Sequence, residues 1–245
     1  MAAARPHVHG FWEADGATKT FTHALDPELL SAYIPRDARV LDYGCGYGRL
    51  TARLAALGYE RVVGVDPARA MIERGRRESP WLSLRHRPAL PLPEEDGSYD
   101  AALLFAVLTC VPDDDGQRAT VAELARVIRP GGVLYVSEVP IQSDERNVSR
   151  YTRYRESATA PLRPYGTFTT PDGGFFRHHT PGHLRALLDD HGFGIAEERT
   201  GTAPTLNGHI AGYLQLLARR RADGEPRGAG EAGVAGEAGE GRTRS

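Results

Sequence analysis

The chain has 245 residues, and its 40% apolar and 25% charged content is that of an ordinary soluble globular protein. This length allows one sizeable domain and is short for two. The formal net charge of -2 provides no overall basic field that would attract nucleic acid or an anionic membrane, so we expect neither as a partner. Two cysteines are too few for a disulfide framework or a four-cysteine zinc site, and we expect reduced thiols.

The apolar segments are short. The N-terminal residues lack the long apolar run of a signal peptide, and no stretch approaches the roughly 18 apolar residues that span a bilayer. The longest apolar run, residues 101–108, has the length of a buried strand. These features predict a cytoplasmic protein.

Strand and helix patterns alternate through the first half of the chain. Helical spacing or capping signals mark residues 49–57, 68–77 and 117–128. Apolar runs predict strands at residues 39–42, 62–66, 82–86, 99–108 and 133–136. Continuous apolar strands separated by helices predict a parallel sheet covered on both faces.

The second half begins and ends differently. Residues 141–180 fit no regular element, and so long a loop usually indicates a lid or an insertion. A helix at 181–191 then precedes strands at 193–199 and 210–218, which only a loop separates, so this pair should be antiparallel. We therefore predict an α/β, Rossmann-like doubly wound seven-stranded sheet with a C-terminal antiparallel pair and a lid insertion.

The predicted boundaries follow from these patterns. Residues 1–221 form one domain, with an N-terminal cap at 1–38 and the lid insertion at 141–180. Residues 222–245 consist largely of Gly, Ala, Glu and Arg. They cannot bury enough apolar surface to offset the entropy of ordering, so we predict a disordered tail.

A glycine-rich turn follows the first strand, at Gly44-Cys45-Gly46-Tyr47-Gly48. Ligands of doubly wound sheets bind at such turns, where glycine lets the backbone approach a ligand closely. Dinucleotide-binding folds have the motif Gly-x-Gly-x-x-Gly, but Arg49 stands at the third glycine position. Asp42 before the turn suits a cationic ligand better than pyrophosphate, and S-adenosylmethionine carries an amino group and a sulfonium.

Asp66 ends the second strand, 18 residues after Gly48. A carboxylate at this place can accept two hydrogen bonds from a ribose diol. Both classes of nucleotide cofactor need this contact. The combination of Asp42, the early third glycine and Asp66 favours S-adenosylmethionine.

Four segments in this order carry a family resemblance: Val40 to Arg49, Gly64 to Ala68, Leu90 to Asp100, and Arg126 to Leu134. Over residues 39–140 the chain resembles the class I S-adenosylmethionine-dependent methyltransferases. The resemblance implies a set of cofactor contacts with the methionine, ribose, adenine and sulfonium, carried by Tyr43, Gly44, Gly46, Gly48, Asp66, Pro67, Ala89, Leu90 and Phe105, beside Asp42.

The chain departs from this pattern at Arg85-His86-Arg87-Pro88, where relatives often carry an acidic residue that reads the adenine amino group. Adenine contacts there are expected from backbone groups instead.

The acceptor pocket should come from the N-terminal segment and the insertion, which are rich in aromatic and polar residues. The candidate general bases are His23, His178 and His179, although loop histidines are more often surface or hydrogen-bonded residues. Tyr151 and Tyr165 are candidates to orient the acceptor. Arg150 and Arg177 could bind a substrate carboxylate, but a salt bridge within the lid is the stronger expectation.

Asp113-Asp114-Asp115 follows the fourth strand, where some related enzymes place metal ligands. Its position before a helix makes N-capping the better interpretation, and we predict no metal site.

These features predict methyl transfer from S-adenosylmethionine to O or N of a small-molecule acceptor. The abundance of Ala, Gly, Arg and Pro is typical of a GC-rich bacterial genome and suggests a secondary metabolite. Three alternatives stay open: a methyltransferase acting on tRNA or protein, a non-catalytic S-adenosylmethionine-binding module, and an NAD-type oxidoreductase, which Arg49 disfavours. The sequence determines neither the acceptor nor the oligomeric state.

Overall fold

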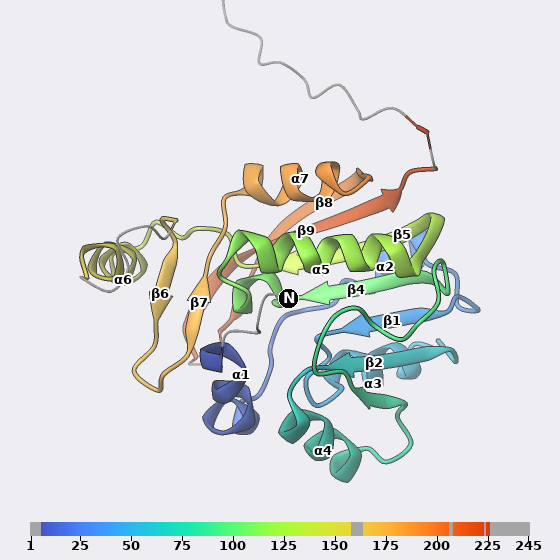
Figure 1. Cartoon of the computed structure of the whole chain (residues 1–245), viewed down its shortest axis with the longest axis horizontal. Coiled ribbons are helices and arrows are strands. Elements are labelled where there is room, and N and C mark those ends of the chain that lie inside the picture. The colour runs from blue at the N-terminus through green and yellow to red at the C-terminus, as the bar shows by residue number, and fades with distance from the viewer. Residues whose placement is uncertain (1–5, 158–163, 206–207, 223, 226–245) are drawn as a thin grey trace, which may run out of the picture.

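The computed structural model describes residues 6–157, 164–205, 208–222 and 224–225. Its main sheet has seven strands (Figure 1): β1 (Val40–Tyr43), β2 (Val62–Asp66), β3 (Leu84–His86), β4 (Tyr99–Phe105), β5 (Ile128–Glu138), β8 (Phe193–Pro204) and β9 (Ile210–Arg220). Their order in the sheet is β3-β2-β1-β4-β5-β9-β8. The first five are parallel, and β9 is antiparallel to both β5 and β8. The predicted fold class is confirmed.

Helices cover both faces of this sheet, as the continuous apolar strands predicted. One face packs against α5 (Asp114–Val127) and α7 (Pro181–Asp190), which lie in front of the sheet in Figure 1. The other face packs against α2 (Pro27–Tyr33) and α3 (Arg49–Ala56). The helix α4 (Arg69–Glu78) lies along β2 and β3.

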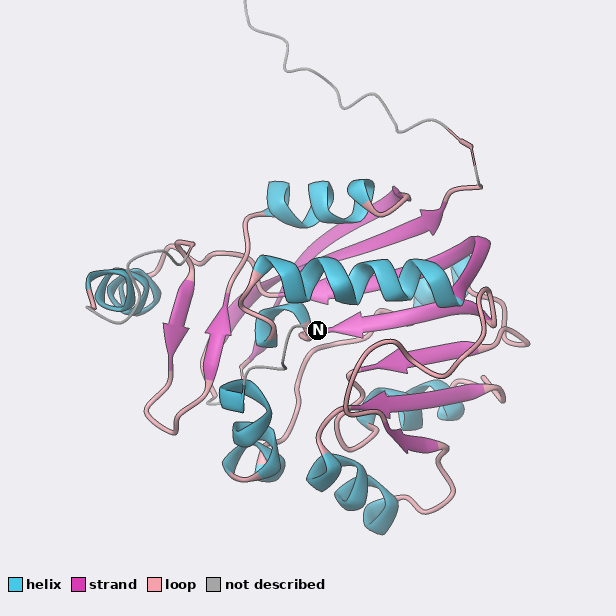
Figure 2. Cartoon of the chain, in the orientation of Figure 1, coloured by secondary structure: helices cyan, strands magenta, loops and turns pink. Residues whose placement is uncertain are grey.

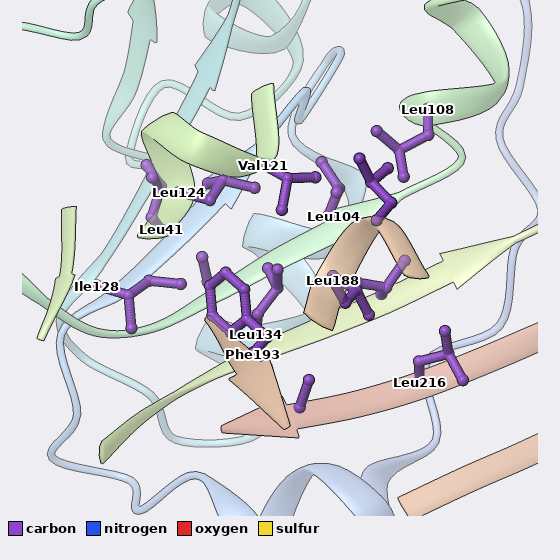
Figure 3. Close-up of a cluster of buried hydrophobic side chains, with 14 of the residues drawn as sticks. Leu41, Leu104, Leu108, Val121, Leu124, Ile128, Leu134, Leu188, Phe193 and Leu216 are labelled. Atoms are coloured by element: carbon purple, nitrogen blue, oxygen red, sulfur yellow. The ribbon is translucent and has the colours of Figure 1, made fainter. Parts of the chain in front are cut away.

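Alternate residues of the central strands divide between the two faces, because successive side chains of a strand point to opposite sides. In β4, Leu104 joins the cluster under α5 and α7, whereas Leu103 joins the cluster under α2 and α3. Figure 3 shows part of the first cluster, to which Leu104, Leu134 and Phe193 belong. The core therefore lies on both sides of a rigid central sheet.

The remaining elements gather at the end of the sheet toward which the arrowheads of β1 and β4 point (Figure 2). They are α1 (Pro6–Glu13), the 3-10 helices η1 (Asp15–Thr18) and η2 (Leu108–Cys110), α6 (Glu145–Glu156), and the hairpin of β6 (Thr167–Thr169) and β7 (Phe175–Arg177). Glu13 accepts the N–H groups of Arg69 and Ala70 at 2.7 and 2.9 Å, and Lys19 pairs with Asp172 of the hairpin at 2.7 Å. The N-terminal segment is thus joined to both α4 and the insertion.

The prediction of no regular element in residues 141–180 is wrong. Asp144 caps α6 by accepting the N–H of Asn147 at 3.1 Å, and the helix buries only Asn147 and Tyr151. Such a polar helix has no apolar stripe to reveal it. The strands β6 and β7 have three residues each, too few for a clear alternation.

Two strand boundaries also differ. The strand predicted to reach residue 108 ends at Phe105, because Ala106 has a φ of 55° and η2 follows. Residues 130–132, predicted to separate helix and strand, lie within β5, where a register shift opposite Tyr99 and Ala101 accommodates them.

The predicted disordered tail at 222–245 lies almost entirely outside the described residues. Within the described part of the chain, no helix is both long enough and apolar enough to cross a membrane.

Candidate active site

A cavity of about 1130 Å³ lies at the carboxyl ends of β1, β2 and β4. Its walls come from segments far apart in the chain: the glycine turn, the N-terminal segment, the loop after β4, the start of α5, and the insertion. This is the location at which parallel α/β sheets bind ligands. Most residues expected to contact a cofactor line it: Asp42, Tyr43, Gly44, Gly46, Asp66, Pro67, Ala89, Leu90 and Phe105.

The glycine turn has the backbone that its sequence demands. Gly44, Gly46 and Gly48 have φ of 70°, 57° and 86°, in the left-handed region that favours glycine. A Cβ on Gly44 would collide with the side chain of Val107, and one on Gly46 with the ring of Phe21. Gly48 does not line the cavity and instead precedes α3 as its N-cap, so its predicted cofactor contact stays a prediction.

Asp66 connects two segments of the cavity wall, the glycine turn and the residue before α4. Its Oδ2 accepts the N–H of Gly46 and its Oδ1 accepts the N–H of Ala68, both at 2.8 Å. A carboxylate has about four acceptor positions, so each oxygen keeps room for a further donor. Burial raises the pKa of Asp66 to about 6, against the opposing effect of these two hydrogen bonds.

Asp42 lies on the same side of the cavity and is almost fully buried. Its Oδ2 accepts the hydroxyl of Thr51 at 2.7 Å. Burial raises the pKa of Asp42 to about 6. Two buried carboxylates therefore give this half of the cavity an acidic character.

His178 lies on the opposite side, where the insertion covers the cavity. Its Nδ1 is 2.6 Å from the phenol oxygen of Tyr151, which in turn accepts the N–H of Gln142 at 3.3 Å. Tyr151 is 1% exposed and does not line the cavity. The structure thus brings these two predicted residues together, with Tyr151 behind His178.

The hydrogen-bond pattern indicates the tautomer of His178. The phenol oxygen of Tyr151 accepts the N–H of Gln142. Within the described residues, His178 Nδ1 is the acceptor that the hydroxyl hydrogen of Tyr151 can reach. A phenol that donates to Nδ1 leaves the ring hydrogen on Nε2. Burial, followed by the charge of Arg150, lowers the pKa of His178 well below its usual value. The neutral ring therefore offers a hydrogen-bond donor.

His23 also lines the cavity, with its Nδ1 3.3 Å from the hydroxyl of Ser137. Burial and then the charge of Arg49 lower the pKa of His23 to about 4. His179 is buried outside the cavity wall, stacked on His183, and burial lowers its pKa to about 3. Tyr165 packs edge-on against Tyr151 and does not line the cavity.

The charged residues of the lid separate into two kinds. Arg177 forms an ion pair with Asp114 of α5, so its salt bridge joins the insertion to α5 and is not the expected one within the lid. Arg150 forms no ion pair within the described part of the chain and lies 3.5 Å above the ring of Phe168, facing the cavity.

The acidic run after β4 has a structural role. Asp113 caps α5 by accepting the N–H of Gly116 at 2.8 Å, as predicted, while Asp115 pairs with Arg118 at 2.6 Å. Among residues 6–157, 164–205, 208–222 and 224–225, no group of three or more His, Cys, Asp or Glu is arranged to hold a metal ion.

Residues 85–88, where relatives often carry an acidic residue, are held by contacts within the protein. His86 is hydrogen-bonded to the carbonyl of Pro67 at 3.0 Å, and Arg87 pairs with Glu94 at 3.1 Å. Pro88 lines the cavity next to Ala89.

Sequence reasoning missed Glu138, which shapes the cavity. Glu138 ends β5 with 0% exposure and accepts the N–H groups of Leu108 and Thr109 at 2.7 and 3.1 Å, which fixes the loop after β4. A carboxylate closing an apolar strand was the available signal. Asn147, one of the polar residues of the insertion from which the acceptor pocket was expected, lines the cavity at 1% exposure.

Comparison with known proteins supports this interpretation of the site. The methyltransferase-domain family matches residues 40–132. A solved S-adenosylmethionine-dependent methyltransferase of Methanosarcina mazei is 28% identical, with a TM-score of 0.73, over 81% of this chain and 99% of that one. The resemblance to the class I S-adenosylmethionine-dependent methyltransferases that the sequence predicted is confirmed. The cofactor implied by this methyltransferase family and its fold is S-adenosylmethionine.

Two relatives of this chain carry names that state an activity. A ubiquinone biosynthesis O-methyltransferase of Xanthomonas axonopodis pv. citri is 36% identical over 136 residues, 52% of this chain and 55% of that protein. The chain thus spans about half the length of the relatives of that name. An O-methyltransferase, rstn1, of Aspergillus nomiae is 26% identical over 204 residues, 78% of this chain and 81% of that protein.

The buried carboxyl of Glu138 should make stability depend on pH. Burial raises the pKa of Glu138 from 4.5 to about 8, so the folded state holds this proton more tightly than the unfolded state. The stabilisation is fully present below about 4.5 and is lost as pH rises toward 8. We expect the unfolding free energy of the native chain, relative to Glu138→Gln, to fall between pH 5 and pH 8 in urea titrations. A difference that does not change with pH would contradict this, and Glu28→Gln, at an exposed residue of α2, is the matched control.

Proposed function

We propose that this chain transfers a methyl group from S-adenosylmethionine to an oxygen of a small molecule. The observation that carries the proposal is a single cavity that joins the Asp66 and glycine-turn side to the His178 and Arg150 side. Its volume of about 1130 Å³ exceeds the range of roughly 300–1,000 Å³ that is usual for one drug-sized ligand, so cofactor and acceptor can share it. The names of the Xanthomonas and Aspergillus relatives support oxygen as the accepting atom.

The residues at the acidic end fit the cofactor. Asp66 has free acceptor positions for the two ribose hydroxyls, and the buried carboxylate of Asp42 suits a cationic group. Ala89 and Leu90 provide apolar wall for the adenine, beside Pro67. When bound, the cofactor supplies a methyl group on an electron-poor sulfur.

The protein then has to hold the acceptor oxygen in line with that methyl group, about 3 Å away. The opposite side of the cavity is suited to this task. His178 presents a donor toward the cavity and is kept in place by Tyr151, so His178 contacts the acceptor and Tyr151 positions His178. His23 borders the same space next to Ser137. The low pKa of both histidines keeps them neutral near pH 7.

The role of Asp66 can be measured directly. We expect Asp66→Ala to weaken S-adenosylmethionine binding by about 1–3 kcal/mol, roughly 5- to 150-fold in Kd, because charge-assisted hydrogen bonds to the ribose are lost. Isothermal calorimetry measures this, with Asp96→Ala as the control, because Asp96 is an exposed carboxylate before β4 that pairs with Arg126. An unchanged Kd would refute the role of Asp66. Failure of the native chain to bind millimolar S-adenosylmethionine would refute the proposed function.

The role of His178 gives a second test. We expect His178→Ala to lower the rate of transfer from labelled cofactor to a small-molecule extract by about 10- to 100-fold, the effect of losing a hydrogen bond to the acceptor. Tyr151→Phe should give a smaller loss, and neither variant should change the Kd of the cofactor. His183→Ala, in α7 outside the cavity, is the control.

The pH profile separates this role from general-base catalysis. Any loss of transfer rate toward acid pH should come from protonation of Asp42 and Asp66, whose pKa is raised to about 6, and should persist in His178→Ala. The histidines should not contribute, because the pKa of His23 is lowered to about 4 and that of His178 also lies well below its usual value. An acid limb near pH 6.5 that disappears in His178→Ala would contradict the assigned role.

A further inference from the structure

The lid half of the cavity contains two arginines that have no carboxylate partner among the described residues. Arg146 and Arg150 of α6 both line the cavity, and neither forms an ion pair within the described part of the chain. The Nε of Arg150 is buried and has no hydrogen-bond partner there. A buried guanidinium donor without a partner is costly, which makes it a candidate for binding a ligand.

The geometry keeps Arg150 in place without a carboxylate. Its guanidinium lies 3.5 Å above the ring of Phe168 and 5.6 Å from that of Tyr151. Stacking on aromatic rings orients the planar fork and leaves its edge free for hydrogen bonding. Arg146 and Arg150 are four residues apart, so they lie on the same face of α6.

The acids around this region are already bound to other groups. Asp144, the N-cap of α6, accepts the backbone and side-chain N–H groups of Asn147. Asp114 pairs with Arg177, and Asp115 with Arg118. The positive charge of Arg150 is therefore not neutralised by a direct partner of its own.

Two further groups extend the same site. His178 directs a neutral donor to the cavity, as its contact with Tyr151 indicates. Asn147 is 1% exposed and lines the cavity, and its Oδ1 has no hydrogen-bond partner among the described residues. A ligand here would meet two cations, one neutral donor and one amide acceptor. The neighbouring walls are the aromatic rings of Trp12, Phe168 and Phe176.

We propose that the methyl acceptor is a flat, apolar molecule carrying an anionic oxygen, which Arg150 and Arg146 bind, and a hydroxyl, which Asn147 accepts. The anionic oxygen belongs to a carboxylate or to an ionised phenol, since both present the same charge to a guanidinium. This inference rests on the proposed function, because it names the class of substrate for the same cavity.

The test compares each acid with its uncharged counterpart in the complex with S-adenosylhomocysteine. The probes are the three monohydroxybenzoates against the corresponding hydroxybenzamides, and 4-nitrophenol against 4-nitroanisole at pH 8. Calorimetry should show the anionic member of at least one set binding about 10- to 100-fold more tightly than its neutral counterpart. Preference within the first set identifies a carboxylate, and preference within the second identifies a phenolate.

Variants of α6 assign the preference to Arg150. Arg150→Gln should reduce it to less than about 3-fold, and Arg150→Lys should keep part of it, because lysine retains the charge without the planar fork. Arg153→Gln removes the same charge from an exposed position of α6 outside the cavity and should keep the full preference. Normal binding of S-adenosylhomocysteine by each variant shows that it is folded.

Three results would overturn the inference: equal binding of anionic and neutral probes, no binding of any anion at millimolar concentration, or a full preference in Arg150→Gln. These results differ from failure of the proposed function, which is the absence of cofactor binding by the native chain. If the chain binds cofactor and transfers methyl groups but binds anionic and neutral probes equally, only this inference is refuted.

Discussion

The carboxylate of Asp66 holds together the end of the cavity on which the rest of the site depends. One oxygen accepts the N–H of Gly46 and the other accepts the N–H of Ala68, so the glycine turn and the start of α4 are fixed to the end of β2. Burial of this group has a cost, visible in its pKa of about 6. The cost is reduced by the two backbone donors, and the oxygens keep acceptor positions for a ligand. The same contacts thus shape the cavity and prepare it for a ribose.

The cavity has opposite electrostatic character at its two ends. Asp42 and Asp66 make the β1–β2 end acidic, whereas Arg146, Arg150 and the donor of His178 occupy the end under the insertion. A cationic cofactor and an anionic acceptor would each be placed at the end that complements it, with their reacting atoms between. In this account the protein contributes mainly by orienting two ligands.

The cofactor end could be predicted from the sequence because its determinants are local. A glycine turn between a strand and a helix, and an aspartate at the end of the next strand, indicate a ligand site without any knowledge of how the rest of the chain packs. The acceptor end could not be predicted to the same extent. The pairing of Tyr151 with His178, and the difference between Arg150 and Arg177, depend on how an irregular insertion packs over the sheet. Its helix α6 has no apolar stripe, and Glu138 acts through backbone groups 30 residues earlier in the chain.

The central claim is that one cavity holds the cofactor at Asp66 and directs its sulfur toward the lid. A crystal structure with S-adenosylhomocysteine tests this most directly. The account predicts ribose hydroxyls within hydrogen-bond distance of Asp66, and a sulfur whose open side faces His178 and Arg150. A ribose bound away from Asp66, or a sulfur that faces away from the insertion, would contradict it.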